Sequence, residues 1–285
     1  MNTERQAALR TAYLEACEME LRAFKPGNVS VHSEGHGMTV EDFRRSAEAS
    51  APFLCDESLS LGERIYRAIE ATHAAVGCNT NLGIVLLAAP LILAYETRRD
   101  GEALRTALDR VLAGTTRGDA AWVYRAIRVA QPGGLGAAPE QDVRAEPGVT
   151  LLEAMRLAEA RDRIAFQYTN SYADILADSI PRYHSSLSQW GHEEWAAVAV
   201  FTGLLRRHPD SHIERKSGTR HHRRVAGWMD RIERALLDSD QPEQAMRLLR
   251  EADAEFKSHG INPGTTADLT VACLLAVRLE ILLMK

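Results

Sequence analysis

The run "LGIVLLAAPLILAY", residues 82–95, is the most apolar stretch of the chain and indicates its fold class. It carries no charge, but it is shorter than the ~20 residues that a bilayer crossing requires, and Pro90 interrupts it. A second apolar run, "LTVACLLAVRLEILLM" (269–284), has Arg278 and Glu280 in its middle. We therefore interpret both runs as buried helices of a large α-helical core and not as membrane spans.

The remaining sequence is rich in helix signals and lacks the alternating β-branched runs that strands need. A first helix is expected over about residues 3–24, a second behind Thr39 as its N-cap, and a third over about residues 60–76. The only long loop is expected at Pro132–Gly148, where glycine and proline gather. These signals predict an all-α fold, with residues 1–285 forming a single compact multi-helix domain.

The net charge, the cysteines and the N-terminal sequence limit the partners and the cellular location that we expect for the protein. The net charge of -5 argues against a whole-surface attraction to nucleic acid or to an anionic membrane. The 4 cysteines form no CxxC pair and no short secreted framework, so we expect them to be reduced and mostly buried. The N-terminus "MNTERQAALRTAYLEA" has no apolar signal region, which predicts a cytoplasmic protein. The oligomeric state is left open, including a homo-oligomer.

Three breaks rich in Gly, Asn and Thr stand beside expected helix ends: "KPGN" (25–28), "GCNTNLG" (77–83) and "GINPGTTADL" (260–269). A helix start preceded by small polar residues exposes free backbone N–H groups and the positive end of the helix dipole, which suits a phosphate. Each break taken alone is more simply explained as an ordinary helix stop or cap. The presence of all three favours a polyphosphate site.

The segment "RRHPDSHIERKSGTRHHRR" (206–224) is the densest cationic run in an otherwise acidic chain. Arg215 and Lys216 in its centre are candidates for gripping phosphate oxygens, because arginine binds oxyanion pairs and lysine acts as a point charge. The alternative is a solvated loop between helices, which suits the outer arginines best. Nucleic-acid binding is weaker, because no groove-reading motif accompanies the charges.

Four aspartates lie among small or apolar residues of expected helices: Asp119, Asp162, Asp174 and Asp268. A carboxylate on an apolar helix face costs several kcal/mol unless it has a cation, a metal or a donor as partner. Mg²⁺ bound to nucleotide phosphates would be such a partner. An internal ion pair or an N-cap is the better explanation for Asp174, and Asp162 could pair with a neighbouring arginine.

The stretch "FKPGNVSVHSEGHG" (24–37) divides into two parts. Residues 25–28 are predicted to form one wall of a polyphosphate pocket. Residues 32–37 are predicted to be a mobile loop able to close over the substrate. Zinc is disfavoured, because His32 and His36 are spaced four apart in a Gly-rich loop, not on a helix, and no HExxH motif is present.

Four motifs in order carry a family resemblance: "ExxxxKPGN" (20–28), "GCNTNLG" (77–83), "DSHIERKSG" (210–218) and "NPGTTADLTVA" (262–272). Together they resemble the serial motifs of the triphosphoribosyl-dephospho-CoA synthase family, across nearly the whole chain. The resemblance implies an all-helical enzyme that uses ATP with Mg²⁺. It also implies a reaction in which the 2′-hydroxyl of dephospho-CoA attacks C1′ of the ATP ribose and adenine leaves.

Such a displacement resembles glycoside hydrolysis, so it needs a carboxylate near C1′ and a group that handles the proton of the attacking hydroxyl. The predicted roles are the following. Catalysis is expected from Asp119, Asp268 or Glu20, Mg²⁺ binding from Asp119 and Asp162, and phosphate and ribose contacts from Lys25, Asn28, Asn79, Thr80, Asn81, Arg215, Lys216, Thr265 and Thr266.

The chain departs from the family pattern in its second motif, where the family reads GG-x-NTH-x-G and this chain reads "GCNTNLG" (77–83), so that a glycine and a histidine are replaced. The C-terminal "NPGTTADL" (262–269) and the segment "VYRAIRVAQPGGLG" (123–136) resemble a divergent branch associated with pterin- and furan-linked one-carbon metabolism. A related transferase with a one-carbon coenzyme precursor as acceptor is therefore one alternative. A non-catalytic nucleotide-binding helical protein is a second alternative.

Overall fold

The computed structural model describes residues 2–138 and 140–284, apart from the side chains of residues 2 and 3. Within these ranges the chain is all-α, and extended pairing is limited to two isolated bridges, Ser30 with Ser33 and Gly35 with Met38. The α-helices span Asn2–Arg22 (α1), Val40–Leu54 (α2), Leu61–Val76 (α3), Leu82–Thr97 (α4), Leu104–Ala113 (α5), Arg117–Ala130 (α6), Leu151–Ala158 (α7), Arg163–Thr169 (α8), Ile180–Trp190 (α9), Glu193–Arg207 (α10), Ser211–Ser217 (α11), His222–Leu237 (α12), Met246–Ser258 (α13) and Gly264–Leu283 (α14).

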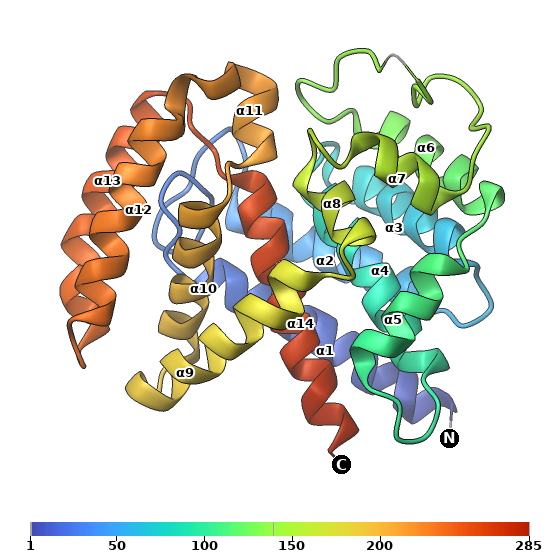
Figure 1. Cartoon of the computed structure of the whole chain (residues 1–285), viewed down its shortest axis with the longest axis horizontal. Helices are drawn as coiled ribbons and strands as arrows, with labels where there is room; N and C mark the ends of the chain where they lie inside the picture. Colours follow the sequence, from blue (N-terminus) through green and yellow to red (C-terminus); the bar gives the residue numbers. More distant parts are fainter. Residues whose placement is uncertain (1, 139, 285) are drawn as a thin grey trace.

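Helices α4 and α14 form the centre of the molecule, as the two apolar runs predicted. They pack against each other, and α14 also packs along α1 (Figure 1). Nearly every side chain of α4 from Leu82 to Ile92 is buried, and so is α14 from Leu269 to Val277. A helix that is apolar on all sides belongs in a core, because no face of it can meet water favourably. Among the described residues no helix combines the length and apolarity that a membrane crossing needs.

The proline in α4 does not end the helix, which continues from Pro90 to Thr97. Proline has no N–H, so the carbonyl of Leu86, four residues earlier, loses its helical partner. The buried hydroxyl of Tyr168 donates a hydrogen bond to this carbonyl at 2.6 Å, and the hydroxyl of Tyr172 donates to the Leu87 carbonyl at 3.2 Å. Two tyrosines from the α8 region therefore satisfy the backbone of the central helix.

Replacing Tyr168 by phenylalanine should lower the free energy of unfolding by about 1–3 kcal/mol, because the Leu86 carbonyl would remain buried without a donor. Denaturant unfolding monitored by circular dichroism measures the change. Tyr66→Phe is the matched control, since the Tyr66 hydroxyl donates to Glu70 in an exposed pair and its loss should cost less than about 0.5 kcal/mol. Equal losses in the two variants would contradict the proposed role of Tyr168.

Helix boundaries follow the capping signals of the sequence. Thr39 caps α2 in a reciprocal capping box with Asp42, and the Ser60 side chain accepts a hydrogen bond from the Glu63 backbone at the start of α3. The first helix ends at Arg22, two residues before the expected boundary. The expected loop between residues 132 and 148 joins α6 to α7, where it lies at the upper right of Figure 1.

Candidate functional site

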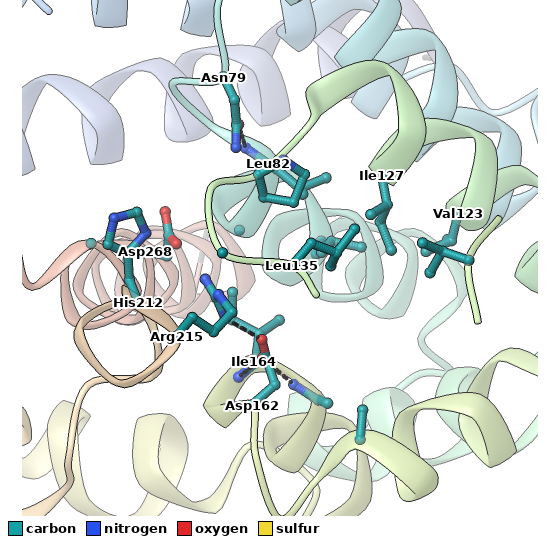
Figure 2. Close-up of a pocket in the computed structure, with 18 of the residues that line it drawn as sticks. Asn79, Leu82, Val123, Ile127, Leu135, Asp162, Ile164, His212, Arg215 and Asp268 are labelled. Carbon is teal, nitrogen blue, oxygen red and sulfur yellow. Dashed lines mark hydrogen bonds and ion pairs between the residues drawn. The ribbon is translucent and has the colours of Figure 1, made fainter. Parts of the chain in front are cut away.

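A cavity of about 430 Å³ lies where the starts of α4, α8, α11 and α14 come together under the α6–α7 loop. Its volume is within the range of natural small-molecule sites. One part is apolar, with Val123, Ile127, Leu135 and Met155 among its lining residues. The other part is polar, and Figure 2 shows side chains from both parts directed toward the same space. The polar lining residues include Glu20, Asn28, Asn79, Thr80, Asp162, His212, Arg215, Asn262 and Asp268.

Asp268 lies in the second turn of α14 and presents its carboxyl group to this cavity (Figure 2). A Cβ atom at Gly83 would come within 2.0 Å of the Asp268 Oδ2, so only glycine at the start of α4 leaves room for the carboxyl group. No donor among the described residues forms a hydrogen bond with it. Burial, followed by the nearby carboxylates of Asp210 and Glu20, raises its pKa well above the ordinary value. The Asp268 carboxyl group can therefore bind a proton near neutral conditions more readily than an ordinary aspartate, or it can bind a ligand in the cavity.

Asp210 joins the start of α11 to the start of α14 through hydrogen bonds. Its Oδ1 caps α11 by accepting from the backbone N–H groups of His212 and Ile213. Its Oδ2 accepts from both the N–H and the hydroxyl of Thr266, each at 2.7 Å, in the first turn of α14. The Thr265 hydroxyl oxygen accepts from the His212 N–H at 3.2 Å. The two threonines predicted to bind phosphate thus bind protein groups and do not line the cavity.

Arg215 is the best-positioned cation of the polar part. Its Nη1 donates to Asp162 Oδ2 at 2.6 Å, and both residues line the cavity (Figure 2). Asp162 also caps α8 through its Oδ1, which accepts from the N–H groups of Ile164 and Ala165. Asp162 was predicted to pair with a neighbouring arginine; its partner is an arginine, but one that lies 53 positions away in the chain. Lys216 is exposed beside Gly133 of the α6–α7 loop and is not among the lining residues.

The arrangement combines a carboxyl group without a partner, an oriented arginine and two long helices that begin at the cavity. A family model for ATP:dephospho-CoA triphosphoribosyl transferase matches residues 6–284 of the chain. The chain belongs to this family. It is a transferase, and the resemblance deduced from the four serial motifs is confirmed.

The fold of the transferase is also found in a solved structure. A protein from Archaeoglobus fulgidus, described as a candidate triphosphoribosyl-dephospho-CoA synthase, superposes with a TM-score of 0.62 and is 23% identical. The match covers 81% of this chain and 96% of that protein. At this identity the likeness supports the shared fold. No curated protein matches the transferase in sequence.

Lys25 of the transferase is not part of the cavity lining. Its side chain is fully buried, and its ammonium group donates to the carbonyls of Glu20, Ala23 and Val29 at 2.5, 3.1 and 3.1 Å. It also lies 3.2 Å from the Glu20 carboxylate, which does line the cavity. All three ammonium hydrogens are thus used within the protein. Lys25 was predicted to contact phosphate, and the structure places it behind Glu20, outside the cavity lining.

The asparagines and Thr80 divide between cavity and core. Asn28 lines the cavity and donates to Asn262 at 2.9 Å, and Asn79 and Thr80 line it at the start of α4. Asn79 Oδ1 accepts from the Leu82 N–H at 3.1 Å and so caps this helix start. Asn81, in contrast, is directed into the core, where it donates to hydroxyl and carbonyl oxygens of α2 and α3. The second-motif departure at Asn81 therefore does not change the cavity lining.

Asp119 also lies away from the cavity. It forms the capping box of α6 with Thr116, and its Oδ1 accepts from the Gly62 N–H of α3 at 2.8 Å. A Cβ at Gly62 would approach the Asp119 backbone to 2.5 Å, so the two helices meet closely at this point. The carboxylate is fully used by donors from its own helix start and from α3. Asp119 was predicted to take catalytic and metal-binding roles, and the structure places it outside the cavity lining, at this contact between α3 and α6.

The segment 32–37, predicted to be a mobile loop, forms hydrogen bonds with other parts of the protein. His36 Nε2 is 2.7 Å from the Gly27 carbonyl, and the Ser33 hydroxyl donates to Asp253 of α13 at 2.6 Å. Asp253 also accepts from the Gly27 N–H, so this one residue of α13 binds both the "KPGN" turn and Ser33. His32 Nε2 lies 3.1 Å from the Arg22 carbonyl. Both histidines thus lie within hydrogen-bonding distance of carbonyl groups.

His212 is a lining residue that the sequence prediction missed. Its Nε2 is buried and has no hydrogen-bond partner in the described structure. Burial, then the charges of Lys216 and Arg215, lowers its pKa to about 4, so the imidazole is neutral at pH 7. The sequence did offer one indication that His212 belongs to the site, because it lies between Asp210 and Arg215 in the third motif.

Proposed function

We propose that this transferase moves the triphosphoribosyl group of ATP to the 2′-hydroxyl of dephospho-CoA and releases adenine. The observation that carries the proposal is Asp268, a protonatable carboxyl group without a partner between the starts of α4 and α14. A group of this kind fits a reaction in which a hydroxyl proton and a departing purine must both be handled. Family membership supplies the two substrates.

The polar part of the cavity suits the triphosphate and ribose of ATP. The N-termini of α4 and α14 supply positive dipole ends, and Arg215 is held in orientation by Asp162. Asn28, Asn79 and Thr80 have polar groups at the same surface and are proposed to contact the ribose or the phosphates.

The chemistry requires positive charge to develop at the ribose C1′ as its bond to adenine N9 breaks and the new bond to the acceptor oxygen forms. Glu20 faces the cavity, and Lys25 behind it opposes the burial that raises the pKa of Glu20. We assign Glu20 to stabilise the charge at C1′ and Asp268 to proton transfer. Neither assignment needs Asp119 or Lys25 to touch substrate.

A divalent cation fits this site only together with ATP. Among the described residues, no group of three His, Cys, Asp or Glu side chains is arranged to hold a metal ion. Mg²⁺ typically takes one or two carboxylates and completes its shell with phosphate and water oxygens. Asp162 is the lining carboxylate we assign to it, because a carboxylate has acceptor sites beyond those used by Arg215 and the α8 N–H groups. The ion would neutralise triphosphate charge in a predominantly acidic lining.

The alternatives find less support in the cavity. The second-motif departure at Asn81 lies in the core, so it gives no contact that would favour a one-carbon coenzyme precursor as acceptor. A non-catalytic nucleotide binder would have no use for the unpaired carboxyl group of Asp268.

Incubating the protein with ATP, Mg²⁺ and dephospho-CoA should release free adenine, detected by chromatography, at a rate that depends on both substrates. Omitting dephospho-CoA is the control for simple ATP breakdown. Thermal protection by ATP without adenine release would indicate a different acceptor. If neither ATP nor inorganic triphosphate shifts the melting temperature, the phosphate site itself is refuted, because a ligand that binds the native state must stabilise it.

A further inference from the structure

His212 is fixed in the cavity wall by its backbone and not by its ring. Its N–H donates to Asp210 Oδ1 at 2.9 Å and to Thr265 Oγ1 at 3.2 Å, which joins α11 to the start of α14. The ring packs against Gly264, where an added Cβ would lie 3.5 Å from the Cγ and Nδ1 atoms. The side chain therefore has a defined position while its Nε2 is left without a partner. An unpaired buried ring nitrogen is costly unless a ligand completes it.

The ring and Asp268 face the same cavity (Figure 2). Asp268 follows Gly264 by four residues on α14, a distance of about one helical turn. The groups that act on the two side chains differ in sign. The positive charges of Lys216 and Arg215 lie near His212, whereas the carboxylates of Asp210, Glu20 and Asp162 lie near Asp268 and outweigh the effect of Arg215 there.

Bound triphosphate would change these two environments in the same direction. Burial is the main cause of the low pKa of His212, and the nearby positive charges lower it further; triphosphate would neutralise these charges, so the imidazole would become a stronger base. Triphosphate would also add negative charge near Asp268, whose raised pKa would remain high. A pair of groups with oppositely shifted pKa values is the usual arrangement of an acid and a base in one active site.

We propose that His212 is the general base that accepts the proton of the attacking 2′-hydroxyl, while Asp268 in its protonated form is the general acid for the departing adenine. The inference rests on the proposed function and assigns its proton transfers. The acceptor O2′ forms a bond to C1′ as its proton moves to His212, and the C1′–N9 bond breaks as adenine N9 receives the Asp268 proton. Proton return from His212 to Asp268, directly or through water, restores the starting state.

The test compares adenine release by wild type, His212→Gln and His212→Ala. Removal of a general base should lower kcat at least 100-fold, with the KM for ATP changed less than about 3-fold. The acidic limb of the kcat–pH profile, assigned to protonation of His212, should disappear in His212→Gln. Added imidazole should restore part of the activity of His212→Ala. His222→Gln is the matched control, because His222 lies 2.9 Å from Glu214 and does not line the cavity.

Each outcome decides between the two proposals. If wild type releases adenine and His212→Gln retains kcat within about threefold, His212 is not the base and the proposed function stands. A lowered kcat with the acidic limb intact and no response to imidazole would make His212 a positioning residue and overturn its role in proton transfer. If wild type releases no adenine, both proposals fail. Loss of activity in His222→Gln of the same size would also overturn the specific role of His212.

Discussion

Replacing Lys25 with methionine should lower the free energy of unfolding by about 3–5 kcal/mol, because breaking one side of a buried ion pair leaves the other charge uncompensated. The Glu20 carboxylate is 4% exposed and has Lys25 as its ion-pair partner. The carbonyls of Ala23 and Val29 would lose a donor as well. Urea unfolding followed by circular dichroism measures the effect.

Two companion variants identify the cause. Lys216→Met removes a lysine that is exposed on α11, and its effect should stay within about 0.5 kcal/mol. The double variant Lys25→Met/Glu20→Gln should recover part of the loss, since it no longer buries a lone carboxylate. The proposed structural role would be wrong if Lys25→Met unfolded like wild type and bound ATP weakly. That result would restore the phosphate contact predicted from the "KPGN" motif.

Asp268→Asn should lower kcat for adenine release by about 10²- to 10⁴-fold, because the amide cannot deliver or accept the proton. The same substitution should raise the free energy of unfolding at pH 8 by about 0.5–2 kcal/mol, since active-site groups are often held at a cost in stability. Steady-state kinetics and thermal unfolding measure the two effects on one preparation. A variant that is both active and no more stable would show that Asp268 is an ordinary surface carboxylate.

The raised pKa of Asp268 also determines how its contribution to the free energy of unfolding changes with pH. The folded-state pKa of Asp268 is raised above its ordinary value of 3.8, so the folded protein binds the proton more tightly than the unfolded chain does. Its contribution to stability is therefore greatest below pH 3.8 and is lost as the pH rises toward the raised value. The stability gain of Asp268→Asn should grow over this interval. Asp42→Asn is the control of opposite sign, because its hydrogen bonds with Thr39 lower the Asp42 pKa.

The sequence predicted the helical elements well because their signals are local. The apolar runs, the caps at Thr39 and Ser60 and the loop at residues 132–148 each depend on neighbouring residues, and each is present in the structure. Pro90 was also visible, but its consequence was not. The carbonyl that it leaves free is satisfied by Tyr168, 82 positions away in the chain.

The candidate site was predicted only in part, because residue type does not reveal which partner a buried polar group will meet. Asp268, Glu20, Arg215 and Asp162 reach the cavity, and their functional roles remain predictions. The predicted site residues that do not line the cavity form hydrogen bonds within the protein or are exposed to solvent. Lys25, Asn81, Asp119, Thr265 and Thr266 hold helix ends and turns, and Lys216 is exposed.

The sequence by itself determined the all-α fold and the family, since helical periodicity, capping and motif order can all be read along the chain. Only the tertiary structure decided which polar residues line the cavity. That choice depends on contacts between distant segments, such as Gly83 against Asp268 and Asp210 against Thr266. A buried donor or acceptor needs a partner, and the fold leaves the His212 Nε2 without one in a cavity that Asp268 also lines, so a ligand can bind there.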